Sequence, residues 1–187
     1  MLADESAPMQ PAPIVPPRVH PGATVVQRLI AAVRLDGALY ADVSADRRAG
    51  GQALLVVLLS GICNGFGLRV RLGDAAMWAG VGTALGGWLL WTLVVWVVAR
   101  TAGARQPGRS LLRALGFATA PGVFLVCGVI PGYGEILRRL VVIWLLAATV
   151  VAVQATYSLT RRRALAISLI AFVIYAAIGA VFDHLAA

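Results

Sequence analysis

Five long apolar stretches, separated by short loops that carry arginines, make up nearly all of the sequence after residue 50. About 20 apolar residues form a helix that crosses a hydrocarbon core of roughly 30 Å. These stretches do not alternate between apolar and polar residues and are too long for barrel strands. The sequence therefore predicts an all-α integral membrane protein, with a five-helix transmembrane domain over residues 50–187. The predicted spans are 51–68, 75–99, 111–130, 140–157 and 164–182.

Composition supports the same class. The mean hydropathy is +0.85, and 13% of the residues are charged, compared with about 25% in a soluble domain. The net charge of +8 would suggest nucleic acid as a partner of a soluble protein. In a membrane protein, we expect these charges to orient the helices and to meet anionic lipid headgroups instead. We therefore expect membrane lipids to be partners of this protein, and we expect it not to bind nucleic acid.

Two segments precede the first span. Residues 1–23 are rich in proline and alanine, which is typical of a disordered tail. Residues 24–49 are expected to form an amphipathic or interfacial segment, with a short helix in which Arg28 lies opposite an apolar face. This helix either lies on the membrane surface or packs beneath the bundle. The apolar residues at helical spacing are Val26, Leu29, Ile30 and Val33.

The arginines predict the orientation. All sixteen basic residues are arginine. Twelve fall on the side of the N-terminus and four on the opposite side. The positive-inside rule then predicts a cytoplasmic N-terminus and tail and an extracytoplasmic C-terminus. The use of arginine without lysine favours a GC-rich bacterial genome, and therefore a bacterial cytoplasmic (inner) membrane.

The first two spans each contain two glycines four residues apart, Gly61 with Gly65 and Gly82 with Gly86. Small residues at this spacing let helix backbones approach closely in lipid. We therefore expect these four glycines to pack the first two spans tightly together.

Polar residues within the spans are few. Ser60, Asn64 and Thr83 either form hydrogen bonds between helices or face a substrate path. Pro121 is expected to kink or break the third span, which either shapes the bundle or, as in some transporters, lines a binding site. We expect an interior that is closed and filled by small residues.

No convergent set of ionisable groups is found. Cys63 and Cys127 both fall within apolar spans, without the close spacing of a metal site. The sequence therefore predicts no catalytic residues, no cofactor and no metal.

Three stretches together resemble the Yip family of Ypt/Rab-interacting membrane proteins, in its broad prokaryotic branch. They are LDGALYADVSADRRAGGQAL before the first span, LLRALGFATAPG in the third span and TRRRALAISL before the last span. The resemblance covers roughly residues 25–185 and implies five spans with a cytoplasmic N-terminus. Eukaryotic members act in vesicle traffic, bind prenylated Rab GTPases and associate with one another. The short tail and the loose LDGALYADV motif depart from those members, and the family pattern supplies no catalytic residues.

The function predicted from these features is that of a non-enzymatic membrane protein. Its role is that of a scaffold, an interaction partner or an accessory subunit of a membrane complex, and its partners are other membrane proteins or a second copy. The alternative is a small transporter or a lipid-handling protein that uses the kinked third span.

Overall fold

The computed structural model describes residues 23–130 and 132–186, without the side chains at 70–72, 74, 182–183 and 185–186. Within these ranges the chain is helical and contains no strand, so the predicted all-α class is confirmed. Residues 1–22 of the tail predicted to be disordered lie outside the described residues. The elements are α1 (Val25–Val33), α2 (Gly37–Ala45), α3 (Ala49–Leu72), η1 (Gly73–Ala75), α4 (Ala76–Thr101), α5 (Gly108–Ala118), η2 (Ala120–Val129), α6 (Gly134–Tyr157) and α7 (Arg161–Ala186).

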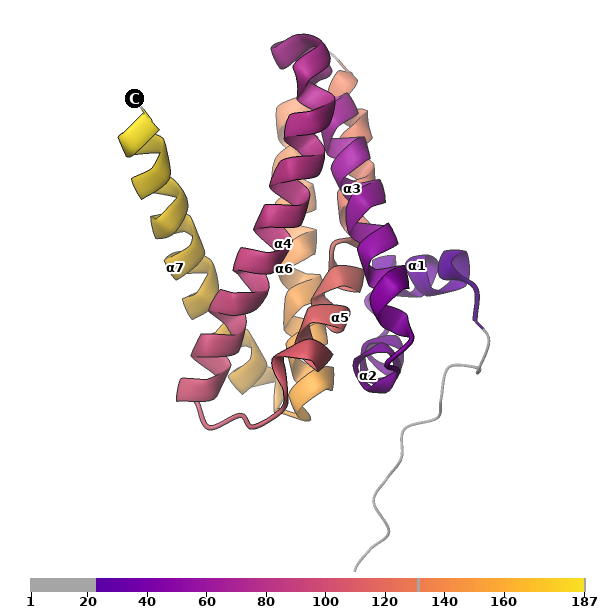
Figure 1. Ribbon diagram of the computed structural model, residues 1–187, viewed down its shortest axis with the longest axis vertical. Helices are drawn as coiled ribbons and strands as arrows, with labels where there is room; N and C mark the ends of the chain where they lie inside the picture. The colour runs from indigo at the N-terminus through magenta and orange to yellow at the C-terminus, as the bar shows by residue number, and fades with distance from the viewer. Residues whose placement is uncertain (1–22, 131, 187) are drawn as a thin grey trace, which may run out of the picture.

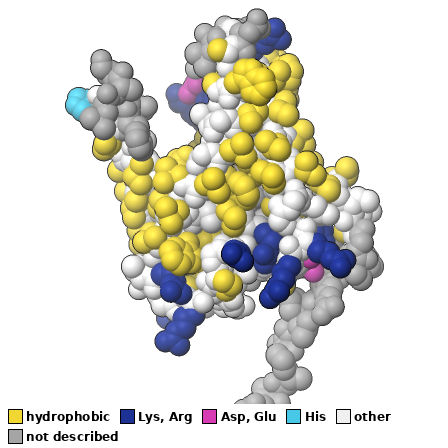
Figure 2. Space-filling view, in the orientation of Figure 1, with side chains coloured by type: hydrophobic (Ala, Val, Ile, Leu, Met, Phe, Trp, Pro, Cys, Tyr) yellow, Lys and Arg dark blue, Asp and Glu magenta, His cyan; other side chains and the backbone are white. Residues whose placement is uncertain are grey.

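Five helical segments are long and apolar enough to cross a membrane, which confirms the predicted number of spans. They are α3, α4, α5 continued by η2, α6 and α7. α3 lies beside α4 along much of its length, whereas the C-terminal end of α7 stands apart from the other helices (Figure 1). Hydrophobic side chains cover the flank of the bundle, and most arginines visible on this face gather at the end where α2 lies and α5 begins (Figure 2).

The segment before the first span forms two helices where the sequence predicts one. The chain turns at Leu35, whose φ is +60°, and Asp36 caps α2 by accepting a hydrogen bond of 2.9 Å from the Ala38 amide. α1 leaves Val26 63% and Ile30 47% exposed. α2 instead packs against α5 and α6, as expected for a helix beneath the bundle. Its buried apolar residues are Leu39, Tyr40 and Val43.

Arg28 fastens α1 to the start of the first span. Its side chain is almost fully buried, and its guanidinium lies 3.2 Å from the Asp46 carboxylate and donates a 2.8 Å hydrogen bond to Gln52. Burial alone would raise the pKa of Asp46. The hydrogen bonds from the Arg48 amide and Arg28, with the charges of Arg28 and Arg113, hold that pKa below its usual value. The carboxylate is therefore stabilised in its charged form.

Arg113 ties α2 to the third span. Its guanidinium donates to the Val43 carbonyl at 3.2 Å and to the Ser44 carbonyl, both in the last turn of α2. A cation at this position complements the negative end of the helix dipole. The two short helices are thus attached to the bundle by buried polar contacts as well as by apolar packing.

Candidate functional site

α3 and α4 meet backbone to backbone along one seam. A Cβ added at Gly61 would lie 2.9 Å from the Ala84 Cβ, and one at Gly65 would lie 2.8 Å from the Met77 Cα. On the facing helix, a Cβ at Gly80 would lie 2.5 Å from the Gly65 Cα. These positions have room for a hydrogen atom only, as is typical of close helix contacts in membranes.

Gly82 and Gly86 do not take part in this seam, although the sequence places them there. Both are exposed, and a Cβ at either would meet nothing within 4 Å. At 3.6 residues per turn, Gly82 lies roughly 200° around the helix from Gly80. α4 therefore carries two faces of small residues, and Gly80 belongs to the one that meets α3.

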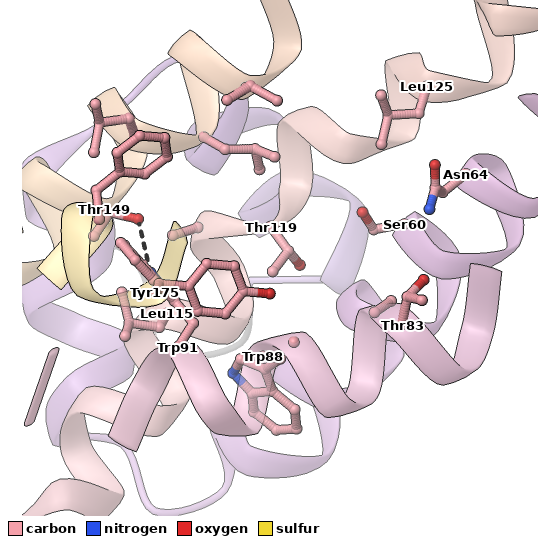
Figure 3. A pocket seen from close by; sticks show the side chains of 17 residues that line it. Ser60, Asn64, Thr83, Trp88, Trp91, Leu115, Thr119, Leu125, Thr149 and Tyr175 are labelled. Atoms are coloured by element: carbon pink, nitrogen blue, oxygen red, sulfur yellow. Dashed lines mark hydrogen bonds between the residues drawn. The ribbon is translucent and has the colours of Figure 1, made fainter. Parts of the chain in front are cut away.

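The third span breaks beside Pro121, where α5 stops and the 3₁₀ helix η2 begins. Proline has no N–H to donate to the carbonyl of Phe117, four residues back, and its ring clashes there. The Thr119 hydroxyl donates a 2.7 Å hydrogen bond to the Gly116 carbonyl, which satisfies that group at the end of α5. The break places Thr119 at the wall of the bundle interior (Figure 3).

η2 packs on another side of α3 through a second close seam. A Cβ at Gly122 would overlap the Ser60 hydroxyl, and one at Gly67 would overlap the Leu125 carbonyl oxygen. α3 is therefore held by near-backbone contacts on two sides.

A cavity of about 340 Å³ lies at the level of this break and is lined by residues from all five spans. The expectation of a closed interior filled by small residues is therefore wrong. The reason lies in α7, whose first half is buried at Ala164, Ile167 and Ala171. Beyond Ala171 none of the described side chains of α7 is buried, and the C-terminal end of the helix stands apart from the bundle (Figure 1).

The three polar residues singled out in the sequence all line this cavity (Figure 3). Ser60 is buried, and Thr83 donates a 3.1 Å hydrogen bond to the Gly80 carbonyl of its own helix. The Oδ1 atom of Asn64 is buried and has no hydrogen-bond partner. A buried acceptor left unpaired costs about 1–3 kcal/mol.

Aromatic side chains form the opposite wall. The Trp91 indole N–H donates to the Thr149 hydroxyl at 3.3 Å, and the Trp91 ring meets the Tyr175 ring edge-on at a centroid distance of 5.3 Å. Trp88 also lines the cavity, and its indole N–H donates to a carbonyl of α5 at 3.1 Å. These contacts join α4 to α5, α6 and α7 around the cavity.

Sequence reasoning missed Gly80, Thr149 and Tyr175. For Gly80 a signal exists, because Ala76, Gly80 and Ala84 form their own series of small residues four apart. No comparable signal marks Thr149 or Tyr175, since their role depends on how α6 and α7 lean.

The lining of the cavity is neutral at pH 7. It contains no Arg, Lys, His, Asp or Glu, and its polar groups are hydroxyls, one carboxamide and indoles. Among the described residues, no three His, Cys, Asp or Glu side chains lie together as a metal site would require.

Fold and cavity together define an integral membrane protein whose five helical spans surround an open intramembrane cavity. The family model of the Yip1 domain matches residues 37–182. The chain therefore belongs to the Yip family, which confirms the resemblance seen in its sequence. No curated protein and no solved structure matches it.

Proposed function

We propose that this protein handles a membrane lipid: it binds part of a lipid molecule in the cavity between its spans, without transforming it chemically. The observation that carries the proposal is the cavity itself, which is mainly apolar and has a few polar groups in its lining. Sites for amphipathic small molecules have this composition, and their volumes start at about 300 Å³.

The position of α7 supports entry from the membrane. The cavity is open rather than enclosed, and Phe172 and Tyr175 of α7 form part of its wall. Beyond them, the described side chains of α7 are exposed or half-buried. A lipid chain can then reach the cavity sideways, without passing a polar loop.

The test is lipid retention after purification in mild detergent, measured by native mass spectrometry. Gly87 points at the cavity, since a Cβ there would lie 3.1 Å from the Tyr175 hydroxyl oxygen. We expect Gly87→Leu to lose most of the bound lipid. Gly82→Leu is the matched control, because it makes the same change on the same helix where a Cβ would meet nothing within 4 Å. Equal retention by both folded variants, checked by their melting temperatures, would rule out the cavity as the binding site.

A second function, that of an interaction scaffold or accessory subunit, is favoured by a different observation. The exposed glycines Gly82 and Gly86 leave a flat strip on α4 that a helix of another membrane protein or of a second copy could approach closely. Cysteines placed at these two positions, in a background without Cys63 and Cys127, should then form disulfide-linked species in native membranes. Only monomer under oxidising conditions would contradict this second function.

For the location, we infer a bacterial cytoplasmic membrane with the N-terminus inside the cell. The support is the distribution of arginines, twelve on the side of the N-terminus and four on the other. Arg47, Arg48, Arg109 and the run at 161–163 then lie where anionic headgroups can meet them.

A further inference from the structure

Several polar groups of the cavity lie near the break in the third span. Figure 3 shows Ser60, Asn64, Thr83 and Thr119 on that side, and the Tyr175 hydroxyl pointing toward them from the aromatic wall. Apolar side chains of α6 and α7 line another part of the cavity. They are Val142, Leu145, Leu146 and Phe172. The cavity therefore offers both hydrogen-bonding groups and apolar surface to a ligand.

The hydrogen bonds already made limit what these polar groups can offer. The hydroxyls of Thr83 and Thr119 donate to the carbonyls of Gly80 and Gly116. Each hydroxyl oxygen can therefore act only as an acceptor toward the cavity. The Asn64 amide nitrogen lies on the side of Ser60 and Thr83 (Figure 3) and offers N–H donors. A matching ligand must then both donate and accept hydrogen bonds, which is what an alcohol group does.

Charge limits the ligand further. The cavity lining holds no cationic or anionic side chain. A phosphate or carboxylate that entered it would lose its hydration without gaining a counter-charge, and an unpaired charge is costly at this depth of a membrane. An uncharged headgroup enters the hydrocarbon region at far lower cost.

We propose that the cavity takes an uncharged lipid with a free hydroxyl, of the monoacylglycerol or diacylglycerol class. The inference rests on the proposed lipid-handling function and names its ligand. The glycerol hydroxyl donates to Thr119 and accepts from Asn64, while an acyl chain lies along Leu145 and Phe172.

Three photoactivatable probes with identical acyl chains test the ligand class on the full chain in nanodiscs. They are a diacylglycerol, its 3-O-methyl ether and the corresponding phosphatidic acid. We expect the diacylglycerol to label peptides of the cavity wall and to be displaced by unlabelled diacylglycerol. The ether should label about three- to tenfold less, because it lacks the donor, and the phosphatidic acid less still.

Two isosteric variants test the residues. Thr119→Val should reduce the preference for the diacylglycerol over its ether to near unity. Thr92→Val is the matched control, because the Thr92 hydroxyl donates to the Trp88 carbonyl at 2.7 Å in the same way but does not line the cavity. It should keep the preference of the original chain.

The outcomes separate the two proposals. Equal labelling of the cavity wall by the diacylglycerol and the phosphatidic acid would overturn the ligand class and leave lipid binding intact. Labelling of the cavity wall by none of the probes would overturn both. The comparison of the three probes uses the unaltered chain. It therefore tests the ligand class even if a variant fails to fold.

Discussion

Replacing Gly80 with alanine is expected to force α3 and α4 apart. A Cβ at this position would lie 2.5 Å from the Gly65 Cα and 2.6 Å from the Gly61 carbonyl oxygen. Carbon atoms in contact prefer separations of about 3.5 Å. All of these neighbours are backbone atoms, so no side-chain rotation relieves the overlap. The helices must therefore separate locally by about 1 Å.

The size of the effect follows from this geometry. Overpacking of a close contact costs typically about 1–3 kcal/mol, and the better helix propensity of alanine returns up to about 1 kcal/mol. A net loss of about 1–2 kcal/mol lowers the melting temperature of a chain of this size by roughly 2–8 °C. The measurement is the fraction of monodisperse protein that survives heating in detergent, followed by size-exclusion chromatography.

Gly82→Ala is the control for Gly80→Ala. It makes the same substitution two residues further along α4, where a Cβ would meet nothing within 4 Å. There only the gain in helix propensity remains, so the melting temperature should stay constant or rise slightly. If the two variants melt together, or if Gly82→Ala is the less stable one, the seam through Gly80 does not determine how α3 and α4 pack.

Three further results are expected. In a background without the native cysteines, Tyr133→Cys should react with an impermeant thiol reagent applied to intact cells, and Gln106→Cys should not; the reverse pattern would invert the proposed orientation. Arg28→Met should lower the melting temperature in detergent, because it removes charge-assisted hydrogen bonds to Asp46 and Gln52, each worth about 1.5–3 kcal/mol. An unchanged melting temperature would show that these bonds do not stabilise the packing of α1. The lowered pKa of Asp46 contributes stability above its unfolded pKa, and that contribution is lost as the pH falls through the folded pKa, so acidification should destabilise the original chain more than Asp46→Asn.

The number and place of the spans could be predicted because hydropathy alone determines which stretches enter the membrane. The ends of the helices are less accessible to that reasoning. The fourth span, predicted over 140–157, begins at Gly134. Its first turns lie beyond the apolar run and carry the Glu135–Arg139 ion pair of 3.2 Å at helical spacing. Ion pairs of this kind stabilise helical turns that lie outside the apolar run, and hydropathy does not identify such turns.

The interior could be predicted only in part. The sequence identifies Ser60, Asn64 and Thr83 as polar residues of the spans, and the structure places all three at the cavity. The sequence does not predict the cavity, because the cavity depends on the tilt of α7 and on aromatic contacts such as that of Trp91 with Tyr175. Tilt and rotation of a span arise from packing against its neighbours, and an apolar run of sufficient length does not encode them.

The break between α1 and α2 was accessible in principle. Asp36 followed by Gly37 is a typical end-and-restart signal, since aspartate caps a new helix readily and glycine weakens the old one. The apolar spacing of the residues before it instead favours one continuous helix. In the structure the cap prevails, and the chain turns at Leu35.

The arrangement of the bundle links the tight seams to the cavity. α3 is held by close contacts on two sides, by α4 through Gly80 and by η2 through Gly122. Ser60 and Asn64 belong to this same helix, so their polar groups are fixed in place relative to both neighbours. Among its described side chains, α7 is buried only along its first half, up to Ala171. Ser60 and Asn64 therefore lie on the closely packed side of the cavity, and α7 is the wall that can shift at the lowest cost in packing.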